Sequence, residues 1–136
     1  MNTHSKNIVV GFLGMTKDFT GTNANRFKRW RPSLGVCGQE HFVVDEFILL
    51  HEQNNKKILD VLQQDILMIS PNTQVIPYLI PTLKNPWDFE EMYTLLYDVI
   101  TDLPIDNNAN YYIHITTGTH VAQICWYLLI EANFIS

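Results

Sequence analysis

The sequence is poor in cysteine, has no long hydrophobic run and carries few basic residues. Its two thiols, at Cys37 and Cys125, lie too far apart to suggest a disulfide framework or a zinc site. No apolar run approaches the roughly 18 residues that cross a bilayer, and the first residues lack the apolar segment of a signal peptide. We therefore expect a cytoplasmic protein with reduced thiols and no membrane partner.

Apolar residues, by contrast, are plentiful. With 46% hydrophobic and 17% charged residues the chain can bury a full core, and its length suits one domain over residues 1–136. The net charge of −5 excludes a surface that binds nucleic acid throughout. Four of the nine Lys and Arg residues nevertheless lie between Arg26 and Arg31. This stretch is either a solvated basic loop or a local site for an anion.

The pattern of apolar residues predicts four strands and three main helices. Strands are expected at residues 7–13, 42–50, 74–80 and 111–116. Helices are expected at residues 56–69, 88–101 and 119–134, with a short helical turn at 33–39. Asp88, with Glu91 three residues later, resembles the capping box that starts a helix.

Strands that alternate with helices predict an α/β fold with a mostly parallel sheet and helices on both faces. Pro77 cannot donate to a strand ladder, so the third strand is expected at a sheet edge and the strand order is 3-2-1-4. In that order the connections reverse between strands one and four, where ligands of open α/β sheets bind. The segments that leave these two strands begin at Gly14 and at Thr116.

The turn from Thr116 to His120 reads TTGTH and precedes the last helix. Glycine permits close approach of the backbone to a ligand, and the helix start offers free N–H groups and the positive end of its dipole. These features suit a phosphate, with threonine hydroxyls and His120 as further donors. The alternative is a plain N-cap, because Thr-Gly-Thr is common before helices.

The long polar segment after the first strand contains RFKRWR at residues 26–31. Arg29 and Arg31 can grip a phosphate in bidentate fashion, and Trp30 can stack on a base. The alternative is that Trp30 and Phe27 attach the loop to the core. Both this segment and the turn at Thr116 are expected at the same edge of the sheet.

Other distinctive residues are expected to be structural. His114 lies within a strand and is predicted to be a core histidine, and Trp87 is predicted to be a core anchor rather than a ligand platform. No carboxylate accompanies the histidines at the spacing of metal ligands, so we expect no metal. Neither a Walker P-loop nor a dinucleotide fingerprint is present, so we expect no cofactor.

The last helix is apolar on almost every side. Its polar residues form one narrow stripe: His120, Gln123, Tyr127 and Glu131. Such a helix is buried on several faces. One face is expected to cover the sheet, and another to meet a second subunit or further chain.

Three segments carry a resemblance to a known family: residues 28–40 (KRWRPSLGVCGQE), 85–93 (NPWDFEEMY) and 113–129 (IHITTGTHVAQICWYLL). They resemble the N-terminal sensor domain of the RtcR family, whose members regulate an RNA-repair operon. The similarity covers essentially the whole chain. That family comprises sigma-54-dependent activators whose sensor is of the CRISPR-associated Rossmann fold (CARF) class. In the full proteins an AAA+ ATPase and a helix-turn-helix follow, and we expect both to be absent from this chain.

The resemblance implies a Rossmann-like homodimer that senses an RNA-derived ligand, either RNA ends or oligoadenylate-like molecules, across its two-fold axis. In the full protein the partners would be the AAA+ domain, sigma-54 RNA polymerase and DNA. Members of the class bind their ligands at the ends of strands one and four, and many have a lysine where this chain has His120. Combining these ends with the basic segment, we expect the ligand-binding residues to be Gly14, Met15, Thr16, Lys17, Arg29, Trp30, Arg31, Thr116, Thr117, Gly118, Thr119, His120 and Gln123.

The function we expect is therefore a regulatory sensor without enzymatic activity and without catalytic residues. Two alternatives stay open. One is a metal-independent ribonuclease that degrades a cyclic oligonucleotide signal, with His120 or Lys17 assisting attack by a 2′-hydroxyl. The other is a pure dimerisation module whose pocket is vestigial.

Overall fold

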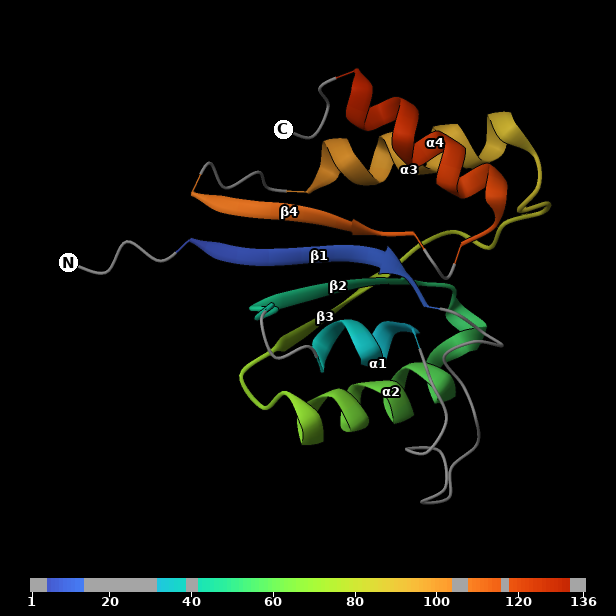
Figure 1. The fold of residues 1–136 in the computed structure, drawn as a ribbon. Helices are drawn as coiled ribbons and strands as arrows, with labels where there is room; N and C mark the ends of the chain where they lie inside the picture. Colours follow the sequence, from blue (N-terminus) through green and yellow to red (C-terminus); the bar gives the residue numbers. More distant parts are fainter. Residues whose placement is uncertain (1–4, 14–31, 39–41, 104–107, 116–117, 133–136) are drawn as a thin grey trace.

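The computed structural model describes residues 5–13, 32–38, 42–103, 108–115 and 118–132 (Figure 1). Its elements in chain order are β1 (Lys6–Phe12), α1 (Pro32–Cys37), β2 (Glu46–His51), the 3-10 helix η2 (Gln53–Asn55), α2 (Lys56–Ile69), β3 (Gln74–Leu79), α3 (Phe89–Asp102), β4 (Ala109–His114) and α4 (His120–Glu131). None of the helices in these ranges has the length and apolar character that crossing a membrane requires.

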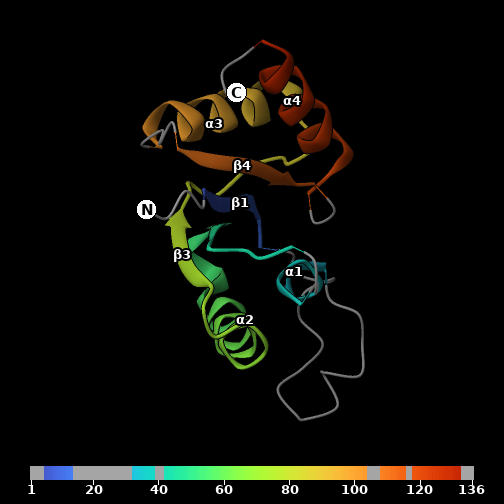
Figure 2. The ribbon, with the colours of Figure 1, turned by 60° about the vertical axis from the view of Figure 1, so that its left-hand side comes forward.

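The strands form one parallel sheet with the order β3-β2-β1-β4. Helices α3 and α4 lie on one face of the sheet, and α1 and α2 lie on the other (Figures 1 and 2). The expected α/β fold, its strand order and its helices on both faces are confirmed.

Two apolar cores result from the alternation of side chains along the central strand. Ile8 and Val10 of β1 pack with α3 and α4, whereas Val9 packs on the opposite face with α1 and α2. Successive residues of a strand point to opposite faces, so a strand covered on both sides must be apolar at nearly every position. This explains why β1 contains the uninterrupted apolar run Ile8-Val9-Val10.

Strand β3 lies at the sheet edge, as Pro77 predicted. The N–H groups of Gln74 and Ile80 donate to the carbonyls of Asp45 and His51, at 2.9 and 2.8 Å. Successive N–H groups of a strand point to opposite sides, so these residues of even number face β2 and Pro77 faces outward. Proline therefore occupies a position where the ladder needs no donor.

Several predicted boundaries were wrong by a few residues. Strand β2 begins at Glu46 rather than at residue 42. The preceding Asp45 already pairs through its backbone, with its N–H donating to the Asn7 carbonyl at 2.9 Å, and its carboxylate also accepts the Asn7 N–H at 2.7 Å. Strand β4 runs two residues earlier than predicted, over Ala109–His114. Helix α1 begins at Pro32, one residue before the predicted start. Proline is accommodated there because the N–H that it lacks has no intrahelical partner in the first turn.

Helix α4 is buried on one face only. Its buried residues are Ala122, Cys125, Trp126 and Leu129. The opposite side exposes large apolar residues: Ile124, Tyr127, Leu128 and Ile130. The prediction that one face of this helix packs toward the sheet is confirmed. No described residue covers the opposite, outer face.

Strands β1 and β4 approach closely at Gly11, which is paired in register with His114. A Cβ atom at Gly11 would lie 2.9 Å from His114 Cβ and 3.0 Å from its carbonyl oxygen. The His114 side chain is 9% exposed, and its ring meets Phe47 edge to face at 6.1 Å. His114 is thus the core histidine that was predicted, and glycine at position 11 leaves room for it.

We expect Gly11→Ala to lower the free energy of unfolding by about 1–3 kcal/mol, because the added methyl group overpacks the strand pair. Urea denaturation of the purified domain measures the loss. The double variant with His114→Gly removes the nearest contact, so its loss should be smaller than the sum of the two single losses. An unchanged urea midpoint in Gly11→Ala would contradict this account.

Candidate functional site

The carboxyl ends of β1 and β4 lie side by side, because Gly11 and His114 are paired in register (Figure 1). The turn that leaves β4 rests on the end of β1. A Cβ atom at Gly118 would lie 3.5 Å from a ring carbon of Phe12 and 3.1 Å from Ala122 Cβ. The tight contact is the one with Ala122, so glycine at position 118 leaves room for the first turn of α4, while the Phe12 ring lies at ordinary contact distance.

Thr119 is the N-cap of α4, and its hydroxyl makes two hydrogen bonds. The oxygen accepts from the Ala122 N–H at 3.1 Å, and the hydroxyl donates to the Pro86 carbonyl at 3.0 Å. The N-cap interpretation of this turn is thus correct for Thr119. Its hydroxyl hydrogen is engaged within the protein, so the groups at the helix start that are suited to an anion are its backbone N–H groups.

Gln123 ties the first turn of α4 back to the end of β4. Its side-chain amide donates to the Ile115 carbonyl at 3.1 Å, and its backbone N–H donates to the Thr119 carbonyl at 3.0 Å. Together with the Thr119 cap, this bond fixes how the helix leaves the turn. The described structure gives Gln123 a positioning role.

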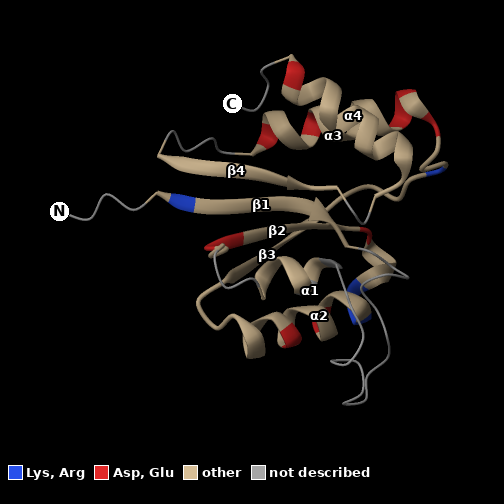
Figure 3. Ribbon diagram, in the orientation of Figure 1, with Lys and Arg blue, Asp and Glu red and all other residues tan. Residues whose placement is uncertain are grey.

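His120 is the first residue of α4, and its side chain is exposed. Its ring lies edge to face with that of Trp87, with centroids 6.3 Å apart. Helix α4 contains no Lys or Arg (Figure 3). Positive potential from the helix itself therefore comes from its N–H groups and from His120 when protonated.

The loop before α3 is held by two carboxylates. Asp88 caps the helix, accepting the N–H groups of Glu90 and Glu91 at 3.0 and 3.4 Å. The Glu91 carboxylate does not reach back to Asp88, as a capping box requires, but accepts the N–H groups of Lys84 and Asn85 at 2.9 Å each. The predicted capping box is half right, and the second carboxylate shapes the loop instead.

Trp87 is exposed at the tip of this loop. The Asn85 side-chain oxygen accepts its backbone N–H at 3.1 Å, and 60% of the residue is accessible. The prediction of a core anchor was therefore wrong, because the loop turns the indole outward beside His120. The sequence signal that could have located it was the predicted position of this loop after the third strand, at the same edge of the sheet.

Nine of the expected ligand-binding residues lie outside the described part of the chain: Gly14, Met15, Thr16, Lys17, Arg29, Trp30, Arg31, Thr116 and Thr117. The structure brings the other four together at the start of α4: Gly118, Thr119, His120 and Gln123. Trp87 and Pro86 join them from the loop before α3.

Other chemistry is scarce in the described ranges. They contain no group of three or more His, Cys, Asp or Glu residues that could hold a metal ion. Burial raises the pKa of the Cys37 thiol to about 12 and raises the pKa of the Cys125 thiol, so neither is a ready nucleophile at neutral pH. Burial and the neighbouring Asp102 raise the pKa of Tyr78 to about 12.

Two grooves lie away from this site. One, of about 460 Å³, runs between β3 and α3 and is lined by residues such as Tyr78 and Asp102. The other, of about 370 Å³, lies between α2 and β3 and is lined by residues such as Asp60 and Val75. Neither groove includes a residue of the α4 helix start.

Comparison with known proteins identifies relatives of the chain in sequence. The family described as "RtcR: Regulator of RNA terminal phosphate cyclase" matches residues 5–136. The transcriptional regulatory protein RtcR of Escherichia coli (strain K12) is 44% identical over 131 residues. That match covers 96% of this chain and 24% of the relative, so the chain spans about a quarter of the relative's length.

Solved structures with the same fold are more distant in sequence. Enterococcus italicus Csm6, bound to cyclic hexa-2′-fluoro-hexa-dAMP, superposes with a TM-score of 0.69 at 17% identity, over 96% of this chain and 32% of Csm6. Can2 from Sulfobacillus thermosulfidooxidans, in complex with cyclic tetra-adenylate, gives 0.56 at 15% identity, over 93% and 30%. These matches confirm the Rossmann-like fold that the resemblance implied.

We expect Thr119→Ala to destabilise the domain by about 0.5–2 kcal/mol, because it removes the α4 cap and the bond to the Pro86 carbonyl. Thr119→Ser keeps the hydroxyl and is the matched control. Urea denaturation of the two variants and the parent compares these effects. Equal stability of the alanine and serine variants would show that the two bonds contribute nothing measurable.

Proposed function

Because the chain belongs to the RtcR family of regulators, we propose that it is a sensor domain that binds an RNA-derived ligand and thereby controls a downstream ATPase. The observation that carries the proposal is the start of α4, seated over the carboxyl end of β1 where the strand connections reverse. Open α/β sheets bind ligands at such points. Free N–H groups at a helix start favour a phosphate.

The ligand class we propose is an oligonucleotide with a phosphate at the first turn of α4. The structures of Csm6 and Can2, which share the fold, contain these proteins bound to cyclic oligonucleotides. An RNA end presents the same phosphate and base chemistry. In the proposal, Gly118 and Thr119 meet the phosphate through the backbone, with His120 beside them.

We assign the basic segment to the same site from its chemistry. Arg29 and Arg31 supply guanidinium groups for phosphates, and Trp30 supplies a stacking surface. Gly14 to Lys17 leave the end of β1 and complete the proposed ligand contacts, together with Thr116 and Thr117. No catalytic step is part of this proposal, which assigns the domain to sensing rather than to cleavage.

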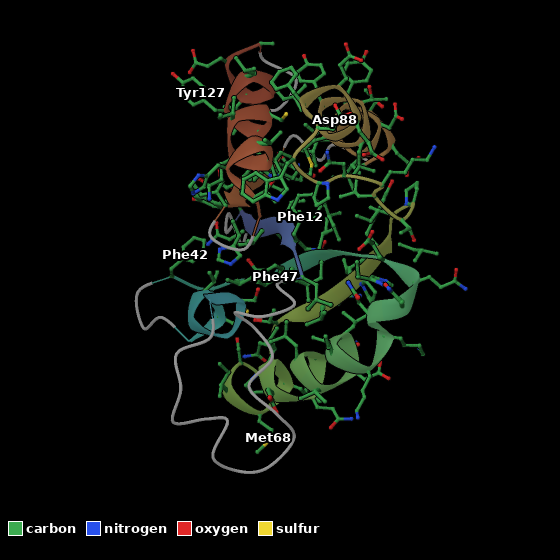
Figure 4. The ribbon with its side chains drawn as sticks, turned by 90° about the vertical axis from the view of Figure 1, so that its right-hand side faces the viewer. Phe12, Phe42, Phe47, Met68, Asp88 and Tyr127 are labelled. Atoms are coloured by element: carbon green, nitrogen blue, oxygen red, sulfur yellow. The ribbon has the colours of Figure 1, made fainter. Side chains whose placement is uncertain are left out.

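We further propose that a second copy of the domain covers the outer face of α4. Ile124 and Tyr127 are 53% and 63% exposed, and Leu128 lies beside them on the same side of the helix. Tyr127 lies on the side of α4 that faces away from α3 (Figure 4). A homodimer buries such a face around a two-fold axis, and cyclic ligands with an even number of repeats can match that symmetry.

This arrangement supplies a mechanism for control. The exposed stripe of α4 begins at His120, so the proposed dimer contact and the proposed ligand site share one helix. A ligand that binds one packing of the two subunits more tightly shifts the dimer toward it. In the full-length protein that change in packing would reach the AAA+ domain, and through it sigma-54 RNA polymerase.

Arg29→Ala should weaken oligonucleotide binding by about ten-fold or more, because a charged hydrogen bond to phosphate contributes about 1.5–3 kcal/mol. Calorimetry measures binding of cyclic tetra-adenylate, cyclic hexa-adenylate and a short RNA with a 2′,3′-cyclic phosphate end. Lys57→Ala, which removes a basic residue from α2, is the control. Parent protein that binds none of the three probes would overturn the proposed function, and unchanged affinity in Arg29→Ala would overturn the role of that residue.

Ile124→Glu should convert the dimer to a monomer, because it places a charge in the apolar contact. Sedimentation velocity of the domain over a range of concentrations measures the change. Leu67→Glu, at an exposed apolar position on α2, is the matched control and should leave the dimer intact. A parent domain that is monomeric throughout, or an unaffected Ile124→Glu dimer, would argue against this face.

A further inference from the structure

Trp87 is an exposed aromatic residue on a well-braced loop. The loop backbone is held by one carboxylate and one side-chain amide. The Glu91 carboxylate accepts the N–H groups of Lys84 and Asn85, and the Asn85 amide oxygen accepts the Trp87 N–H. The Asp88 N–H also donates to the Asn85 carbonyl at 3.0 Å. The indole is therefore presented outward by a defined backbone conformation, and 60% of the residue is accessible.

The loop is connected directly to the proposed ligand site. The carbonyl of Pro86, next to Trp87 in the chain, accepts the Thr119 hydroxyl at 3.0 Å. The Trp87 and His120 rings lie 6.3 Å apart at an interplanar angle of 75°. The indole therefore lies beside the side chain of the first residue of α4.

We propose that Trp87 is a second base-stacking residue of this site, in addition to Trp30, on which a nucleobase lies while a phosphate of the same ligand sits at the first turn of α4. The inference rests on the proposed function and adds a residue that makes binding depend on the base as well as the phosphate. Aromatic side chains stack on every base, since each base has a π-face. Trp87 thus accounts for preference for nucleotides over plain phosphates, without selecting one base.

A purely structural role for Trp87 is the competing explanation. Its ring meets His120, so the indole could serve to orient the imidazole rather than to contact a ligand. The two roles differ in one measurable property. A stacking residue affects ligands that carry a base, whereas a residue that orients His120 affects every phosphate ligand alike.

The test uses linear tetra-adenylate with a 2′,3′-cyclic phosphate and an abasic sugar-phosphate of the same length and end. In Trp87→Ala, affinity for the adenylate should fall by about ten-fold, in line with the loss of one base–aromatic stack. Affinity of Trp87→Ala for the abasic probe should stay within about two-fold of the parent's affinity. Calorimetry measures the binding of both probes. Trp87→Phe keeps a ring and should retain most of the adenylate affinity.

Fluorescence gives a second measurement. A base stacked on the indole should quench its emission, so the measurement is made in a Trp30→Phe background, which leaves Trp87 and the buried Trp126 as the fluorophores. The quenching should persist in that background and disappear when Trp87→Phe is added. Equal weakening of both probes in Trp87→Ala, or none, would overturn the stacking role while leaving the proposed function in place. Parent protein that binds neither probe nor any cyclic oligoadenylate would overturn both.

Discussion

The close parallel pairing of β1 with β4 is the constraint on which the rest of this domain depends. Glycine at position 11 lets the two backbones and the His114 side chain share the space between the sheet and its covering helices. The two strands therefore end side by side, and the turn at Gly118 can rest against Phe12. Helix α4 starts from that turn, so its N–H groups lie at the switch point of the sheet rather than along its face.

The second organising feature is the loop between β3 and α3. The carboxylates of Asp88 and Glu91 accept different backbone N–H groups of this region. Asp88 satisfies the first N–H groups of α3, and Glu91 satisfies those of the residues before the turn. With its backbone paired in this way, the loop can display an indole outward and still offer the Pro86 carbonyl to Thr119. Structural carboxylates thus shape a surface that is proposed to bind an anionic ligand.

Much of the fold could be predicted from local rules. Pro77 pointed to an edge strand, and the alternation of strands with helices pointed to parallel pairing, so the order of all four strands followed. The helix at residues 56–69 was predicted with its observed bounds. The start of β2 was missed because Phe42 and Val43 continue its apolar pattern, although backbone pairing begins only near Asp45. An apolar pattern alone does not show at which residue the pairing begins.

The candidate site was only partly predictable, for a physical reason that Trp87 illustrates. A tryptophan is usually buried, and its exposure here depends on where the Glu91 carboxylate finds its donors. The capping-box pattern predicts that this carboxylate accepts the Asp88 N–H. In the structure it accepts the N–H groups of Lys84 and Asn85 instead. Likewise, the apolar sequence of α4 indicated burial but not which side would be left uncovered by the described chain.

The single hydrogen bond from Thr119 to Pro86 has a mechanical consequence. It joins the beginnings of α3 and α4 at a point where their chains are far apart in sequence, so the two helices are clamped at the same end. The geometry of the α4 helix start therefore depends on the loop before α3, so a ligand at either element meets a surface whose two parts are fixed to each other.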